Sequence, residues 1–102
     1  MKRLCEYDEY GPGMGFSSMK AFMEEKPYPG MDMIVAYLRS GRKTFAACGR
    51  ACDFFTEEMI PGEYCGMTDG VYSWISSLAY YVEKYNLRLL PEFERYVLER
   101  GI

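Results

Sequence analysis

The sequence contains no histidine, no long apolar run and no excess of basic residues. Without histidine, general acid–base chemistry would fall to carboxylates, tyrosine, cysteine or lysine. No stretch approaches the roughly 18 consecutive apolar residues of a membrane span, and Lys2 and Arg3 are not followed by the apolar run of a secretory signal. We therefore expect a cytoplasmic protein without a membrane partner.

The charged residues are separated along the chain, although the net charge is only −3. Residues 39–50 contain bases and no acid, whereas residues 53–69 contain acids and no base. The bases are Arg39, Arg42, Lys43 and Arg50, and the acids are Asp53, Glu57, Glu58, Glu63 and Asp69. The two segments either pair across neighbouring strands or form a bipolar surface that docks a charged partner. Nucleic-acid-binding proteins normally carry a basic stripe with interleaved aromatic residues, so we expect no nucleic acid here.

Length and composition favour a single domain that spans residues 1–102. The chain has 102 residues, of which 49% are apolar and 17% aromatic, and a chain of this size buries roughly 65% of its unfolded surface. Residues 1–16 are rich in turn-forming residues, and we expect them to be loosely ordered. Their glycines match neither a dinucleotide fingerprint nor a phosphate-binding loop, so the sequence predicts no cofactor.

The stretch from Glu63 to Tyr85 is the predicted centre of the fold. Asp69-Gly70 lies between two runs rich in Tyr, Val and Trp, which predicts a hairpin with a type I′ turn and arms at 63–67 and 71–74. The apolar period then changes to that of a helix over 77–85, capped by Ser76 or Ser77. The apolar face of that helix is formed by Leu78, Tyr81, Val82 and Tyr85.

Helix-capping residues, prolines and glycines predict the bounds of the other helices. Ser17 or Ser18 begins a short helix that Pro27 ends, Asp32 caps a helix over 32–40 with Gly41 at its C-terminus, and Pro91 opens a helix over 91–100. Residues 44–48 are predicted as a strand, with a helix over 43–58 as the alternative and a second extended piece at 53–56. We expect an α+β fold: two N-terminal helices, an antiparallel meander of about three strands, and two C-terminal helices packed on one face.

The four cysteines leave a second hypothesis open. Without a secretory signal their thiols should be reduced, and free cysteine behaves as a small hydrophobe. A metal site or a thiol-redox centre would use Cys48 and Cys52 with Cys5 or Cys65, and convergence of the cysteines in space would distinguish it. Cys48 and Cys52 have three intervening residues where a zinc knuckle usually has two. The residues concerned are Cys5, Cys48, Cys52 and Cys65.

Ten tyrosines are the most unusual feature of the composition. Tyr81 and Tyr85 fall on the apolar helix face, whereas Tyr72 and Tyr80 can lie on the exposed side, where tyrosine is enriched in binding hot spots. The predicted binding surface combines aromatic and acidic residues around the hairpin: Tyr72, Trp74, Tyr80, Asp69, Glu57 and Glu58.

Several segments resemble one group of small uncharacterised bacterial proteins. These are TDGVYSW at 68–74, LAYYVEKYNL at 78–87 and LPEF at 90–93. In that group the segment DFFTE at 53–57 would correspond to a D-x-F-T-G-E turn, from which this chain departs by having Glu57 in place of the glycine. The resemblance implies a bacterial or phage-related cytoplasmic origin and a shared fold, and it implies no activity.

We see no catalytic constellation, so the first functional hypothesis is a non-enzymatic protein-interaction module of immunity or regulatory type. The metal or thiol-redox protein is the alternative, and an enzyme using Glu57, Glu58 and Asp69 is a third. Another protein is the expected partner, and a homodimer is compatible with the exposed edges of a small sheet.

Overall fold

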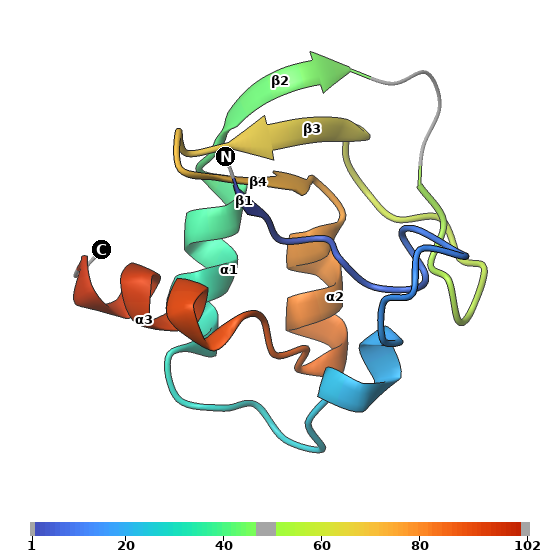
Figure 1. Cartoon of the computed structure of the whole chain (residues 1–102), viewed down its shortest axis with the longest axis horizontal. Helices are drawn as coiled ribbons and strands as arrows, with labels where there is room; N and C mark the ends of the chain where they lie inside the picture. The colour runs from blue at the N-terminus through green and yellow to red at the C-terminus, as the bar shows by residue number, and fades with distance from the viewer. Residues whose placement is uncertain (1, 47–50, 101–102) are drawn as a thin grey trace.

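The computed structural model describes residues 2–46 and 51–100, which form a four-stranded sheet with α-helices on one face (Figure 1). Across the sheet the order is β1 (Lys2–Arg3), β4 (Tyr72–Ile75), β3 (Cys65–Thr68) and β2 (Arg42–Ala46). The helices are the single 3-10 turn η1 (Met19–Phe22), α1 (Met31–Arg39), α2 (Leu78–Tyr85) and α3 (Pro91–Glu99). The α+β class is therefore confirmed. No described helix is long and apolar enough to cross a membrane.

The core lies between the sheet and the helices because β4 alternates. Tyr72 and Trp74 are buried and face α3, where their rings lie 4.9 and 6.2 Å from the ring of Phe93. The indole Nε1 of Trp74 donates to the carbonyl of Leu38 in α1 at 3.1 Å. Burial of one such side chain stabilises the fold by roughly 1.5–3 kcal/mol, so this strand fixes two helices on the sheet.

The predicted hairpin is present, but its turn differs from type I′. That turn needs positive φ at both central residues, and here Gly70 (φ +97°) has it whereas Asp69 does not. The Asp69 carboxylate instead accepts hydrogen bonds from the amides of Val71 and Tyr72, both at 2.8 Å. A side chain therefore closes the turn.

The predicted N-terminal caps of the helices are only partly confirmed. The start of α1 follows Gly30 in the left-handed region, and Asp32 lies inside the first turn instead of capping it. Ser77 precedes α2 without a capping bond, because its hydroxyl bonds that of Tyr10. Pro91 begins α3 as predicted.

Gly41 follows α1 without the left-handed conformation that was predicted for it. A Cβ there would lie 2.6 Å from Cζ2 of Trp74. The glycine is therefore needed for the close approach of this ring.

The N-terminal part departs most from expectation. The first predicted helix is only the turn η1, capped by the hydroxyl of Ser18. The sheet has a fourth strand, β1, which pairs in parallel with β4, so the predicted three-stranded meander is wrong in strand number and order. The amide of Leu4 donates to the carbonyl of Ser73 at 2.9 Å, and Tyr7 is buried.

The strand predicted at 44–48 is observed as β2, which excludes helix for 42–46, and residues 47–50 lie outside the described chain. Residues 54–56 form a turn, so the extended piece predicted there is wrong. A bridge between Cys52 and Met59 holds the two sides of this turn together.

Candidate functional site

The predicted aromatic and acidic surface does not exist as one patch. Tyr72 and Trp74 are only 5% and 3% exposed, so neither can contact a partner. The prediction assigned Tyr72 to the wrong face of its strand. Residues two apart on a strand point to the same side, so Tyr72 and Trp74 both point into the core. Asp69 is half-buried and accepts a hydrogen bond from the hydroxyl of Tyr37. Burial tends to raise the pKa of Asp69, but this bond and the turn amides lower it below its ordinary value.

The remaining predicted residues lie around a different centre. Glu57 and Glu58 are exposed on the turn that follows Asp53, and Glu57 has a positive φ of +63°. Tyr80 on α2 is half-buried, and its hydroxyl donates to the carboxylate of Asp53 at 2.8 Å. The structure thus brings Tyr80 to this turn and leaves Asp69 at the hairpin.

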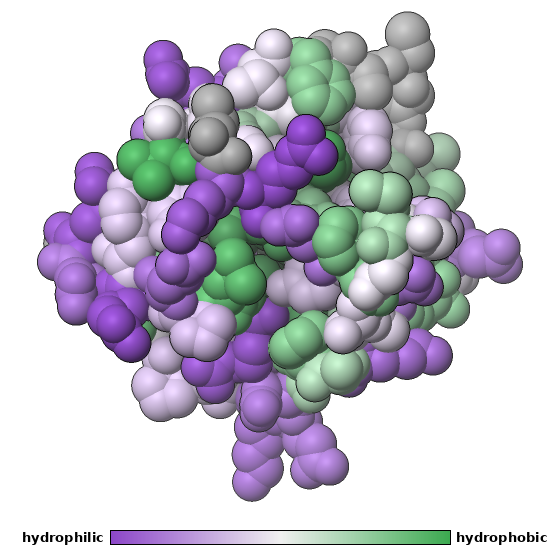
Figure 2. All heavy atoms as spheres, viewed as in Figure 1, coloured by the Kyte–Doolittle hydropathy of each residue, from purple (hydrophilic) through white to green (hydrophobic). Residues whose placement is uncertain are grey.

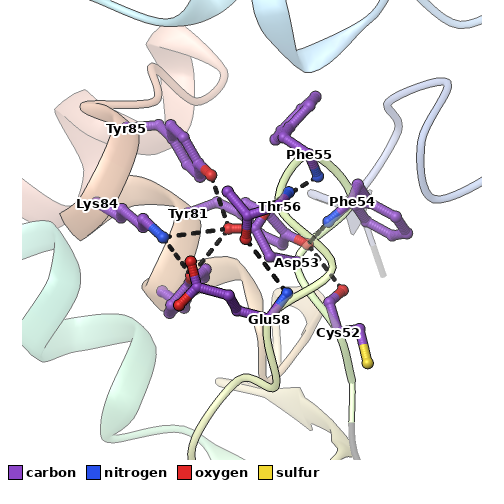
Figure 3. Close-up of polar contacts among 10 residues, drawn as sticks. Cys52, Asp53, Phe54, Phe55, Thr56, Glu58, Tyr81, Lys84 and Tyr85 are labelled. Atoms are coloured by element: carbon purple, nitrogen blue, oxygen red, sulfur yellow. Dashed lines mark hydrogen bonds and ion pairs between the residues drawn. The ribbon is translucent and has the colours of Figure 1, made fainter.

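Asp53 is the polar centre that sequence reasoning missed (Figure 3). Its side chain is completely buried. Oδ1 accepts hydrogen bonds from the amides of Phe55 and Thr56 at 2.7 and 3.2 Å. Oδ2 accepts from the hydroxyls of Tyr80 and Tyr85 at 2.8 and 2.7 Å, and the ammonium of Lys84 lies 3.6 Å away.

The Asp53 carboxylate is ionised despite its burial. Burial alone would raise its pKa, but the bonds from Tyr85, the Phe55 amide and Tyr80 outweigh that effect and hold the pKa at about 2. Both oxygens are occupied, so this centre fastens the 53–58 turn to α2. A local signal existed, because an Asp side chain often closes a turn by accepting hydrogen bonds from backbone amides two or three residues later. Nothing in the sequence, however, distinguished Asp53 from the neighbouring acidic residues as the buried one.

The cysteines do not form a recognisable site within the described residues. Cys65 is buried, Cys5 is half-buried and Cys52 is exposed, while Cys48 lies outside the described chain. Among the described residues no three His, Cys, Asp or Glu side chains are placed to hold a metal ion. Burial raises the pKa of Cys5 to about 12, which the hydrogen bond from the Ile75 amide only partly offsets, so its thiol stays protonated.

The separated charges are paired in part. Lys43 forms an ion pair with Glu63, which joins the basic segment to the acidic one. Arg39 instead reaches Glu83 on α2, outside the acidic segment. All four side chains are at least half exposed, and exposed pairs contribute only about 0–1 kcal/mol.

An apolar groove lies where the N-terminal segment, η1 and the α2–α3 connection meet. In Figure 2, hydrophobic residues surround a hollow near the centre of the face, with hydrophilic residues around them. The groove has a volume of about 310 Å³, at the lower end of the roughly 300–1,000 Å³ typical of ligand pockets. Its apolar lining is Leu4, Tyr7, Phe22, Leu89, Leu90 and Pro91.

Hydrogen bonds between distant segments fix the walls of the groove. The amide of Arg88 donates to the carbonyl of Phe22 at 2.8 Å, and the hydroxyl of Tyr7 donates to the carbonyl of Arg88 at 3.0 Å. Arg88 also binds Glu94 through two nitrogens at 3.0 and 2.7 Å. The groove is therefore built before any ligand arrives, while Phe22 and Leu90 remain 42% and 40% exposed.

Two charged side chains at the groove stand apart from this network. Arg3 and Glu6 line it and are exposed. Within the described part of the chain, neither side chain has a hydrogen-bond or ion-pair partner. An apolar groove flanked by unpaired charges can hold an apolar group and orient it through a neighbouring charge.

Comparisons with protein-family models, curated proteins and solved structures found no match, so the functional argument depends on the geometry above.

Proposed function

We propose that the protein is a non-enzymatic protein-interaction module whose partner places one large apolar side chain in the groove. The observation that carries this proposal is the pairing of a rigid apolar wall with the exposed side chains of Phe22 and Leu90. Interaction energy in protein interfaces is concentrated in a few apolar or aromatic anchors that fill such pockets.

Charge supports a partner segment with a basic residue next to its apolar anchor. Glu6 and Arg3 both line the groove without a partner among the described residues, and the net charge of −3 of the chain favours a basic partner over an acidic one. Complementary charge at the rim of an interface favours association and selects the partner. The proposal moves the predicted interaction surface from the hairpin to the groove.

The test is selection from a phage-displayed library of random peptides on the full chain, followed by binding measurements on two variants. Leu90→Gln changes the groove, and Leu98→Gln changes a leucine of equal exposure that does not line it. Selected peptides should contain a large apolar residue beside a basic one. Leu90→Gln should weaken them about tenfold, corresponding to about 1.4 kcal/mol, while Leu98→Gln leaves them unchanged.

Two results would contradict the proposal. Peptides that bind both leucine variants equally would place the interaction elsewhere. Dimerisation of the free protein that Leu90→Gln abolishes would make a second copy of this chain the occupant of the groove.

A further inference from the structure

The sheet face opposite the helices holds a second hollow, of about 380 Å³. Tyr72 and Trp74 face the helices, so Ser73 and Ile75 between them face the other way. Strand pairing extends this face across the sheet, because Gly66 lies opposite Ile75 and Arg3 opposite Ser73. This second hollow is called the sheet hollow below.

A β-bulge and a glycine shape one end of the sheet hollow. The pairing of β2 with β3 shifts between Lys43 and Phe45, so Thr44 is the extra residue. Bulges re-aim side chains, and here both Thr44 and Phe45 lie over Gly66: a Cβ there would be 2.6 Å from the Thr44 hydroxyl and 2.3 Å from Cε1 of Phe45. The ring of Phe45 stays 53% exposed and forms an aromatic wall.

The sheet face that holds the hollow has an arginine at each edge, of which Arg3 lines the hollow and Arg42 lies outside its lining. Arg3 pairs with Ser73, Ser73 with Thr68 and Thr68 with Arg42, so one row across the four described strands has an arginine at each edge. Neither arginine side chain has an ion-pair or hydrogen-bond partner among the described residues. The adjacent lysines are neutralised instead, Lys2 by Glu92 and Lys43 by Glu63.

We propose that the sheet hollow binds a small anion carrying a planar aromatic ring. The ring of the ligand stacks on the ring of Phe45, with the spacing that aromatic pairs adopt. The anionic group of the ligand binds the guanidinium of Arg3, whose planar donors suit carboxylate or phosphate. Arg3 is three strand spacings from Phe45, and the register places it two residues further along the strands, which gives roughly 16 Å between their backbones. That span, shortened by the arginine side chain, suits a ring joined to its charge by a short chain.

Two ligand sources share this chemistry: an aromatic carboxylic acid and a nucleoside monophosphate. The sheet hollow is a different site from the groove of the peptide interaction proposed above, because Phe45 and Gly66 line the sheet hollow and not the groove. Arg3 is the residue that lines both.

The experiment is an NMR titration of the full labelled chain with 3-phenylpropionate and, separately, with adenosine monophosphate. The matched control ligands are the neutral 3-phenylpropionamide and the non-aromatic 3-cyclohexylpropionate for the first anion, and adenosine and ribose 5-phosphate for the second. We expect amide shifts at Gly66 and Ser73, and an affinity at least about tenfold higher for one of the two aromatic anions than for its controls. The anion that binds identifies the source.

Variants assign the contacts. Phe45→Leu keeps an apolar side chain on an exposed strand and should remove the preference for the aromatic ring, and Arg3→Gln should remove the preference for the anion. Leu90→Gln should bind the anion as the unchanged chain does. Equal binding of the neutral amide, unchanged affinity in Phe45→Leu, or shifts confined to the groove would each overturn the proposal. So would no binding of either anion, even if peptide binding at the groove persists.

Discussion

Asp53 and Arg3 are opposite ways of placing a charge in the same small fold. The carboxylate of Asp53 is buried and accepts four hydrogen bonds, two from backbone amides and two from tyrosine hydroxyls. The guanidinium of Arg3 is exposed beside two hollows and has no partner among the described residues. A buried charge must have its bonds made within the protein, because its desolvation is otherwise uncompensated. An exposed charge needs no such bonds and stays available to a ligand.

Of the substitutions that test this comparison, Asp53→Ala should have the largest effect on stability. The hydroxyls of Tyr80 and Tyr85 and the amides of Phe55 and Thr56 would lose their acceptor, so we expect a loss of about 3–5 kcal/mol in the free energy of unfolding. Urea denaturation measures it. Asp8→Asn, at an exposed acid, should change stability by less than about 0.5 kcal/mol. A loss in Asp53→Ala no larger than in Asp8→Asn would show that the centre does not hold the turn.

Acid should reveal the same centre without a loss of side-chain volume. The pKa of Asp53 is about 2 in the folded state, below its ordinary 3.8, so the unfolded state binds more protons between these values. Its contribution, about 2 kcal/mol, is fully present above pH 4 and is lost as the pH falls towards 2. Asp53→Asn should flatten this part of the stability–pH curve. An unchanged curve in the variant would assign the acid sensitivity to other carboxylates.

One donor to Asp53 should matter less than the carboxylate itself. Tyr85→Phe removes a single hydroxyl from Oδ2, and we expect a loss of about 1–2 kcal/mol together with a raised pKa for Asp53. Tyr64→Phe is the matched control, since Tyr64 is also half-buried and its hydroxyl makes no hydrogen bond with the described residues. Chemical denaturation of both variants, with NMR titration of the carboxylate, tests this. Equal losses would mean that ring packing, and not the bond, is being measured.

Arg3→Gln should have the smallest effect on stability, within about 0.5 kcal/mol. The same substitution should weaken binding of the anion in the sheet hollow about tenfold. Arg3 would then matter for binding and hardly at all for stability. Thermal unfolding and the titration described above measure the two quantities. A large loss of stability would mean that Arg3 is part of the fold and would remove the contrast with Asp53.

Local sequence signals were sufficient for α2, α3 and the hairpin. Each carries its own information: an apolar period for α2, Pro91 at the start of α3, and Asp69-Gly70 between two strand-like runs. The facing of Tyr72 was also within reach, because strict alternation from Trp74 places both rings on one side.

Other features depend on contacts that no local pattern contains. The strand β1 has two residues and no period, and it exists because β4 offers a parallel edge 70 positions later. Asp53 resembles the exposed Glu57 and Glu58 in sequence, and only the tyrosines of α2 distinguish it. The groove joins η1 to the α2–α3 connection, and the sheet hollow needs the strand order, so neither candidate site could be assembled before the topology was known.

The parallel pairing of β1 has a consequence for the order of events during synthesis. Lys2 and Arg3 leave the ribosome early, but their partners Tyr72 and Ser73 emerge only after most of the chain has been made. Until then the wall that Arg3 gives to both hollows does not exist. A nascent or truncated chain that lacks β4 therefore lacks this wall of the groove and of the sheet hollow, and the ligands proposed for them would bind only after β4 has been made.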